Sequence, residues 1–196
     1  MKNLKIRAFC LIIASFIVLL LPVNSSAAKR KKVDYVGKTF YLQTNMWNES
    51  GKDILSTNFH RGGIIPVGTE VTIKSMGRTA IKFTTKETGK QFKFVLAKKH
   101  SKLNIFELAD RYFGADHPLT GKYTNFSAEE KDSIKKGIIT TGMSKDAVVM
   151  AYGYPPTHRT PGLDLDTWNY WENRIRRFEV MFSKGKVVNI NGMTFN

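Results

Sequence analysis

The residues of this sequence best suited to chemistry are its histidines and two aspartates that follow one of them. The histidines are scattered along the chain, at His60, His100, His117 and His158. None has the His-x-x-x-His spacing that places two metal ligands on one helix face. In the segment HRTPGLDLDTW, Asp164 and Asp166 follow His158, and their carboxylates could bind a cation or assist a base. A polar loop before a strand explains the same residues, so we expect no catalytic residue, no metal and no cofactor.

Nucleophilic catalysis has no better support. The one cysteine, Cys10, lies in an apolar run near the start of the chain, and no Gly-x-Ser-x-Gly motif is present. If that run is removed, the protein has no disulfide, no thiolate nucleophile and no cysteine-ligated metal. The sequence therefore predicts a protein that acts by binding and not an enzyme.

Aromatic and arginine residues gather in one short stretch that could form a protein interface. Trp171 is followed by Arg174, Arg176 and Arg177. Tryptophan and arginine are enriched among the residues that dominate binding energy at interfaces. These four are the candidate partner-binding residues.

The start of the chain has the pattern of an export signal. Basic residues precede Ala8–Val23, which is a run of 16 residues that are apolar except for Ser15, and the small residues NSSAA follow. This predicts a signal peptide over residues 1–28 with cleavage after Ala28, and an exported protein in the periplasm or at the outer-membrane periphery. Lipidation is not expected, since Cys10 is not at the end of the run. The alternative is an uncleaved N-terminal membrane anchor, although a bilayer span needs roughly 20 apolar residues.

The charge of the expected mature chain is uneven. Lys29–His100 holds 15 basic and 5 acidic residues, whereas Ser101–Asn196 holds 13 basic and 11 acidic residues. For an exported protein we expect no nucleic-acid partner. The excess of positive charge in the first half indicates an anionic membrane surface, an acidic cell-wall polymer, or a role in solubility alone.

Residues 33–98 have the pattern of a small all-β domain. The segments KTFYLQT, TEVTIKS, TAIKFTT and KQFKFVL are rich in β-branched and aromatic residues, and stretches with glycine, asparagine or proline separate them. Short strands at this spacing predict a small barrel or a rolled sheet. The segment GGIIPVGTEVTIKS resembles SH3-like domains of the bacterial envelope, in which a Pro-x-Gly-Thr turn leads into a central strand.

Two helices are expected next. In SKLNIFELADRYFG, Asn104 can cap a helix with Glu107 in the box position and Gly114 as its end, within a helical bridge over residues 103–126. In SAEEKDSIKKG, the cap is Ser127 and the end is Gly137.

A third helix is expected in GMSKDAVVMAYGYPP. Ser144 can cap its first turn, Met143 can pack on Val148, and Gly153 can end it in the left-handed conformation ahead of Pro155. Each of these residues specifies geometry and not chemistry.

The chain then returns to strands. In DTWNYWEN, Trp168 and Tyr170 fall on one face and are expected in the core, while Trp171 points to the opposite face and is expected to be exposed. The segment RRFEVMFSKGKVVNING reads as two strands joined by a turn at Lys184 and Gly185.

The order GMSKDAVVMAYGYPP, TWNYW and RRFEVMFSKGKVVNI resembles the BamE (SmpA/OmlA) family of outer-membrane assembly lipoproteins. The matching positions are Gly142, Met143, Ser144, Val148, Gly153, Pro155, Trp168, Tyr170, Phe182, Gly185, Val187, Val188 and Ile190. The match spans roughly residues 128–191. The chain departs from the family in lacking a lipid-attachment cysteine and in the basic β segment that precedes the match.

The resemblance implies an α+β domain over residues 127–196, with two helices against a three-stranded antiparallel sheet. It also implies a non-enzymatic scaffold that supports assembly of outer-membrane β-barrels by contact with other envelope proteins. The alternative function is that the basic β domain docks on anionic lipid or cell-wall polymer, with the C-terminal domain as its support.

Overall fold

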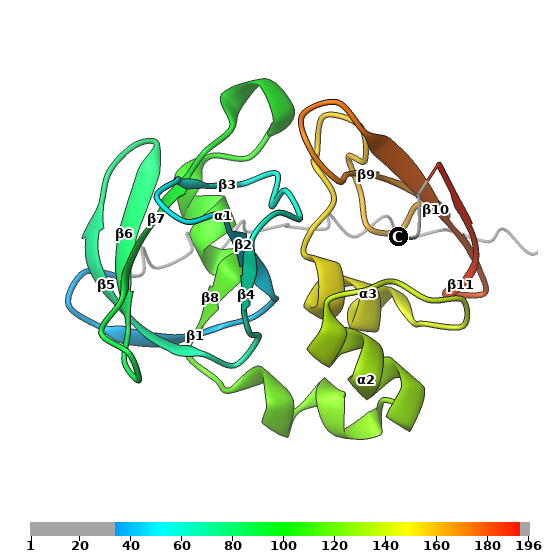
Figure 1. Cartoon of the computed structure of the whole chain (residues 1–196), viewed down its shortest axis with the longest axis horizontal. Helices are drawn as coiled ribbons and strands as arrows, with labels where there is room; N and C mark the ends of the chain where they lie inside the picture. Colours follow the sequence, from blue (N-terminus) through cyan, green and yellow to red (C-terminus); the bar gives the residue numbers. More distant parts are fainter. Residues whose placement is uncertain (1–33, 193–196) are drawn as a thin grey trace, which may run out of the picture. The chain divides into compact units, whose positions relative to one another are not determined.

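The computed structural model describes residues 34–192 (Figure 1). The expected signal peptide and its cleavage site lie outside these residues. The described chain is α+β, with a curled six-stranded sheet, a three-stranded antiparallel sheet and three α-helices. Within it, no helix is long and apolar enough to cross a membrane.

The six-stranded sheet is built mainly from the first half of the chain. Its strand order is β3-β7-β6-β5-β1-β8, and every pairing is antiparallel except that of β3 with β7. The strands are β1 (Thr39–Leu42), β3 (Ile54–Leu55), β5 (Glu70–Met76), β6 (Ala80–Thr85), β7 (Gln91–Val95) and β8 (Phe113–Gly114). A separate pair is formed by β2 (Met46–Asn48) and β4 (Gly63–Ile65). The four predicted strands of this half are β1, β5, β6 and β7, and the other four were not predicted.

Helix α1 (Ile105–Tyr112) packs into the core of this sheet. Its buried residues Leu108 and Tyr112 belong to the same cluster as Leu42, Phe83 and Phe94. The capping box of Asn104 and Glu107 is present as predicted. The prediction that Gly114 ends the helix is wrong. The chain leaves the helix at Phe113 in an extended conformation, because Phe113 and Gly114 form β8 beside β1.

The second half places two helices against the three-stranded sheet. The helices are α2 (Ala128–Lys136) and α3 (Lys145–Tyr152), and the strands, in the order β11-β10-β9, are β9 (Thr167–Trp171), β10 (Arg177–Ser183) and β11 (Lys186–Asn191). Short 3-10 turns occur at Lys98–His100, Pro118–Thr120 and Lys122–Asn125. Along β10, Phe178, Val180 and Phe182 are buried while the residues between them are exposed, which gives the sheet one apolar face. That face shares a core with residues of α2 and α3.

The caps and turns of this half follow the sequence closely. Ser127 and Ser144 cap α2 and α3, and Gly137 ends α2 in the left-handed conformation. The predicted turn at Lys184 and Gly185 joins β10 to β11, and both residues have positive φ. Gly153 ends α3 differently from the prediction. Its φ of 90° is positive, but its ψ of −178° is extended, because the chain turns directly into Tyr154 and two prolines.

Candidate functional site

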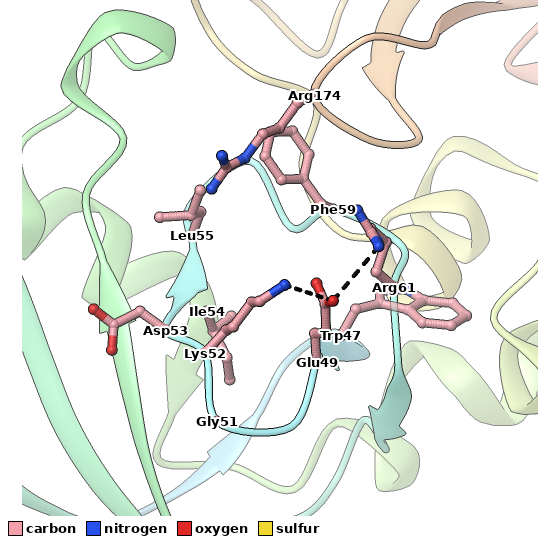
Figure 2. A pocket seen from close by; sticks show the side chains of 10 residues that line it. All are labelled: Trp47, Glu49, Gly51, Lys52, Asp53, Ile54, Leu55, Phe59, Arg61 and Arg174. Carbon is pink, nitrogen blue, oxygen red and sulfur yellow. Dashed lines mark hydrogen bonds and ion pairs between the residues drawn. The ribbon is translucent and has the colours of Figure 1, made fainter.

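A cavity of about 680 Å³ lies between the segment Trp47–Arg61 and the turn that joins β9 to β10. Figure 2 shows its lining, in which Leu55 and Phe59 form part of the apolar wall and Lys52, Arg61 and Arg174 supply positive charge. The cavity therefore offers both apolar contact and cations. Only Arg174 among these residues was singled out from the sequence.

The charges within this cavity are partly paired. Oε1 of Glu49 lies 2.6 Å from Lys52 Nζ and 3.5 Å from the Arg61 guanidinium. The hydrogen bond from Lys52, with the nearby charges of Arg61 and Arg174, lowers the pKa of Glu49. Arg174 forms no ion pair with a carboxylate of residues 34–192, so it is the cation of this cavity most available to a partner.

The turn between β9 and β10 presents an unusual side chain. Ile175 is 87% exposed, the highest exposure among the large apolar residues of the described chain. The turn is held by Asn173, whose side-chain oxygen accepts from the backbone N–H groups of Ile175 and Arg176, each at 2.9 Å. The backbone N–H of Glu172 donates to the Arg176 carbonyl at 3.1 Å and closes the hairpin. Ile175 is thus exposed on an ordered turn.

The arginines surround Ile175. Arg174, Arg176 and Arg177 are all exposed, and Arg176 lies 3.5 Å from the carboxylate of Glu172. Arg174 lines the cavity already described, whereas Arg176 and Arg177 line a second depression of about 670 Å³ together with Ile175. We call Asn173–Arg177 the hairpin tip. The sequence contained a signal for it, because an asparagine side chain often hydrogen-bonds the backbone two residues on and so closes a turn.

Trp171 is placed differently from the expectation. It lies on the face opposite Trp168 and Tyr170, but it is half-buried and not exposed. Its ring centroid lies 5.1 Å from that of His100, and the Arg177 guanidinium lies 5.0 Å above it. The expectation of an exposed Trp171 is wrong because the chain around His100 covers the ring. Trp171 therefore contributes mainly by holding the Arg177 guanidinium over its ring, and only part of its own side chain is exposed.

The residues considered for chemistry are not brought together as a site. His158 Nδ1 lies 3.1 Å from the His100 carbonyl oxygen, and the facing ring nitrogens of the two histidines are 3.4 Å apart. No hydrogen bond within residues 34–192 joins His158 to either aspartate, and Asp166 instead pairs with Lys145 at 3.4 Å. Burial, with repulsion from His100 and nearby arginines, lowers the pKa of His158. Across the described chain, no group of three or more histidine, cysteine, aspartate or glutamate residues could hold a metal ion.

The residues of the family resemblance are structural. Met143, Val148, Gly153, Pro155, Trp168 and Tyr170 are buried, Ser144 is half-buried, and Gly142 is exposed at a positive φ of 89°. The Tyr170 hydroxyl donates to the Gly153 carbonyl at 2.9 Å, which ties β9 to the end of α3.

Glu130 connects the start of α3 to α2 and β11. Its carboxylate accepts from the Ser144 N–H at 2.7 Å, the Ser127 N–H at 3.1 Å and Lys186 Nζ at 3.1 Å. Burial opposes ionisation, but these hydrogen bonds outweigh it and lower the pKa of Glu130 to about 2. This strongly perturbed group is therefore explained by packing and not by catalysis.

Comparison with known proteins finds no matching family, no similar curated protein and no similar solved structure. The assignment therefore depends on the geometry of this chain. The hairpin tip and its neighbouring cavity combine exposed apolar surface with cations and lack a nucleophile–base pair among the residues described. Such an arrangement is suited to binding.

Proposed function

We propose that this chain is an exported, non-enzymatic binding protein that docks on another envelope protein through its hairpin tip. The observation that carries the proposal is Ile175, 87% exposed on an ordered turn and flanked by arginines on both sides. Transfer of an isoleucine side chain from water into an apolar pocket is worth about 1.5 to 3 kcal/mol. A hydrogen-bonded turn that holds such a residue in water is suited to a partner with an apolar pocket that buries the Ile175 side chain.

The chemistry of the tip defines the partner. Ile175 fits a small apolar pocket, and Arg174 and Arg177, which form no ion pair within residues 34–192, fit carboxylates at the rim of that pocket. Arginine presents a planar fork of donors that matches a carboxylate in a bidentate manner. Because the turn is held by Asn173, little conformational entropy is lost when the tip is bound.

The resemblance noted in the sequence narrows the class of partner. The BamE (SmpA/OmlA) family is expected to have two helices against a three-stranded antiparallel sheet, and α2 and α3 share a core with a sheet of that kind. This agreement supports a role as a scaffold or accessory in outer-membrane protein assembly or envelope integrity. The curled first sheet is likewise compatible with the SH3-like resemblance, in which this half would be a second binding module.

The test is capture of partners from envelope extract of the source cells by the purified protein and by two variants. Ile175→Ser removes the apolar apex without removing a core contact. Val188→Ser is the matched control, since Val188 is also an exposed β-branched residue, 51% exposed on β11. We expect Ile175→Ser to lose most of a specific partner while Val188→Ser retains it.

The identity of the captured protein completes the test. An outer-membrane assembly component, crosslinked through a photoreactive residue at position 175, supports the accessory role. If both variants capture the same proteins as the unmodified chain, the hairpin tip is not the interface and the proposal fails. Equal thermal unfolding midpoints for all three proteins establish that the comparison reports binding and not folding.

A further inference from the structure

The outer face of the curled sheet carries a row of lysines. Lys74 of β5, Lys82 of β6 and Lys93 of β7 lie on three neighbouring strands and line one groove of about 520 Å³. Neighbouring strands are about 4.8 Å apart, so the row crosses the sheet over about 10 Å. Lys52 and Lys90 line the same groove from two loops. We call these five residues the lysine groove.

The positions of these lysines are unfavourable for the stability of the sheet. Lys82 and Lys93 are direct partners in the antiparallel register of β6 and β7. Like charges directly opposite each other destabilise an antiparallel pair. The register shift between Ile73 and Ser75 leaves Lys74 without a partner of its own on β6. Three cations are thus gathered on adjacent strands where folding alone would favour mixed charges.

Few carboxylates compensate this charge. Asp53 pairs with Lys93 at 2.7 Å, and Glu49 pairs with Lys52 at 2.6 Å from outside the groove. Lys74, Lys82 and Lys90 form no ion pair with any carboxylate of residues 34–192. By contrast, Lys86, on the turn that follows β6, pairs with Glu70 at 2.6 Å. The uncompensated charge of the sheet is therefore concentrated at the groove.

The remaining lining is suited to a chain that carries negative groups. Gln91 lies opposite Thr84 in the register of β6 and β7 and adds an exposed amide to the groove, whereas the Phe92 ring stacks on the buried Phe83 on the other face of the sheet. Thr84 also lines the groove, and its buried hydroxyl has no hydrogen-bond partner within the described chain. Lysine ammonium groups bind phosphate as point charges and tolerate variable geometry. A groove with cations in a row fits a linear polyanion better than it fits a flat bilayer surface.

We propose that the lysine groove binds a linear, phosphate-bearing polyanion, which lies across β5, β6 and β7 with successive phosphates beside Lys74, Lys82 and Lys93. This site includes no residue of the hairpin tip, although it shares Lys52 with the neighbouring cavity, and it does not depend on the protein interface proposed above. It gives part of the positive excess of Lys29–His100 a defined location. Ionic contacts of this kind weaken as salt rises, because bound counterions are released when the polyanion binds.

The test uses linear polyphosphate as the probe and measures its affinity for the purified protein over a series of salt concentrations. The variant Lys74→Gln/Lys82→Gln removes two cations of the groove that have no carboxylate partner. The matched control is Lys98→Gln/Lys99→Gln, which removes the same charge from two exposed residues of the same half that lie outside the groove. The groove variant should weaken binding at least tenfold at low salt. Its slope of log affinity against log salt concentration should be shallower by the equivalent of about one to two phosphate contacts. The control should change affinity by no more than about twofold.

Other outcomes overturn the proposal. Equal loss in both variants would mean that binding follows net charge and not the groove. No binding of polyphosphate at low salt, or binding by the protein only to vesicles of phosphatidylglycerol, would assign the charge to solubility or to a lipid surface instead. The groove variant should also unfold at the same temperature as the unmodified protein or a higher one, since it removes like-charge repulsion between Lys82 and its neighbours. A lower unfolding temperature would contradict the argument from strand register.

Discussion

Asn58 donates a hydrogen bond from its side-chain amide to the backbone carbonyl of Asn45, at 3.0 Å, and both residues are buried. Each also reaches α3 of the second half. Asn58 donates to the Tyr152 carbonyl at 3.1 Å, and Asn45 donates to the Ala151 carbonyl at 3.1 Å. Two amides from two loops, one before β2 and one after β3, therefore satisfy carbonyls at the end of α3, where the helix itself provides no donors for them.

We expect Asn45→Ala to be strongly destabilising. The amide also donates to the Ile134 carbonyl at 2.6 Å, and its oxygen accepts from the Val67 N–H at 2.8 Å. Removing it leaves buried backbone groups unpaired, and we expect a loss of about 2 to 4 kcal/mol in the free energy of unfolding. Urea titration measures this loss. The control Asn189→Ala, at an exposed position of β11, should change it by less than about 0.5 kcal/mol, and similar losses in the two variants would contradict the role given to Asn45.

We expect Gly153→Val to exceed Ser144→Ala in its effect on stability. Ser144→Ala removes the hydrogen bond from the Ala147 N–H to the cap and should cost about 1 kcal/mol. At Gly153 a Cβ atom would lie 2.6 Å from the Asn58 amide nitrogen, on a backbone with φ of 90°. The substitution therefore strains the backbone and disturbs the buried amide pair together.

Gly89→Ala separates these two effects at Gly153. Gly89 also has positive φ, at 66°, but a Cβ atom there would meet nothing within 4 Å. Gly89→Ala should cost only the backbone strain of about 1 kcal/mol, as measured by thermal unfolding. If Gly153→Val cost no more than Gly89→Ala, the close approach to Asn58 would not matter.

We expect acid to destabilise the second half through Glu130. Its folded-state pKa of about 2 is below the ordinary value of 4.5, so the ionised carboxylate stabilises the folded protein above pH 4.5. This stability should be lost as the pH falls from about 4.5 through about 2. Urea unfolding over that range measures the loss, and Glu130→Gln should show a flatter dependence because it has no carboxylate to protonate. Parallel curves for the two proteins would exclude Glu130 as the cause.

The sequence was most informative where structure is local. The strand β10, the capping box of α1 and the cap of α2 depend on residues within a few positions of each other, and all were predicted. The strands β2, β3, β4 and β8 were not predicted, since each is short and pairs with a strand distant in the sequence. β8, for example, pairs Gly114 with Tyr41.

The candidate site was harder to predict than the fold. The arginines of the hairpin tip could be named from composition, but the exposure of Ile175 depends on the turn that Asn173 closes. Trp171 was expected at the surface, and the contact that covers it comes from His100, which is 71 positions earlier in the chain. The cavity walls likewise come from segments far apart in the sequence. The hydrophobic periodicity of a sequence does not predict such long-range contacts.

Because β8 pairs with the edge of β1, the first sheet cannot finish folding until β8 has been synthesised. β1 lies near the start of the described chain, yet its outer edge and the residues that cover Phe83 and Phe94 come from Ile105–Gly114. A chain emerging in order from its N-terminus would hold β1, β5, β6 and β7 with an open edge and an uncovered apolar face until residue 114 arrived. A fragment that ends at His100 should therefore aggregate, and a chaperone that binds exposed strands would have its longest opportunity during that interval.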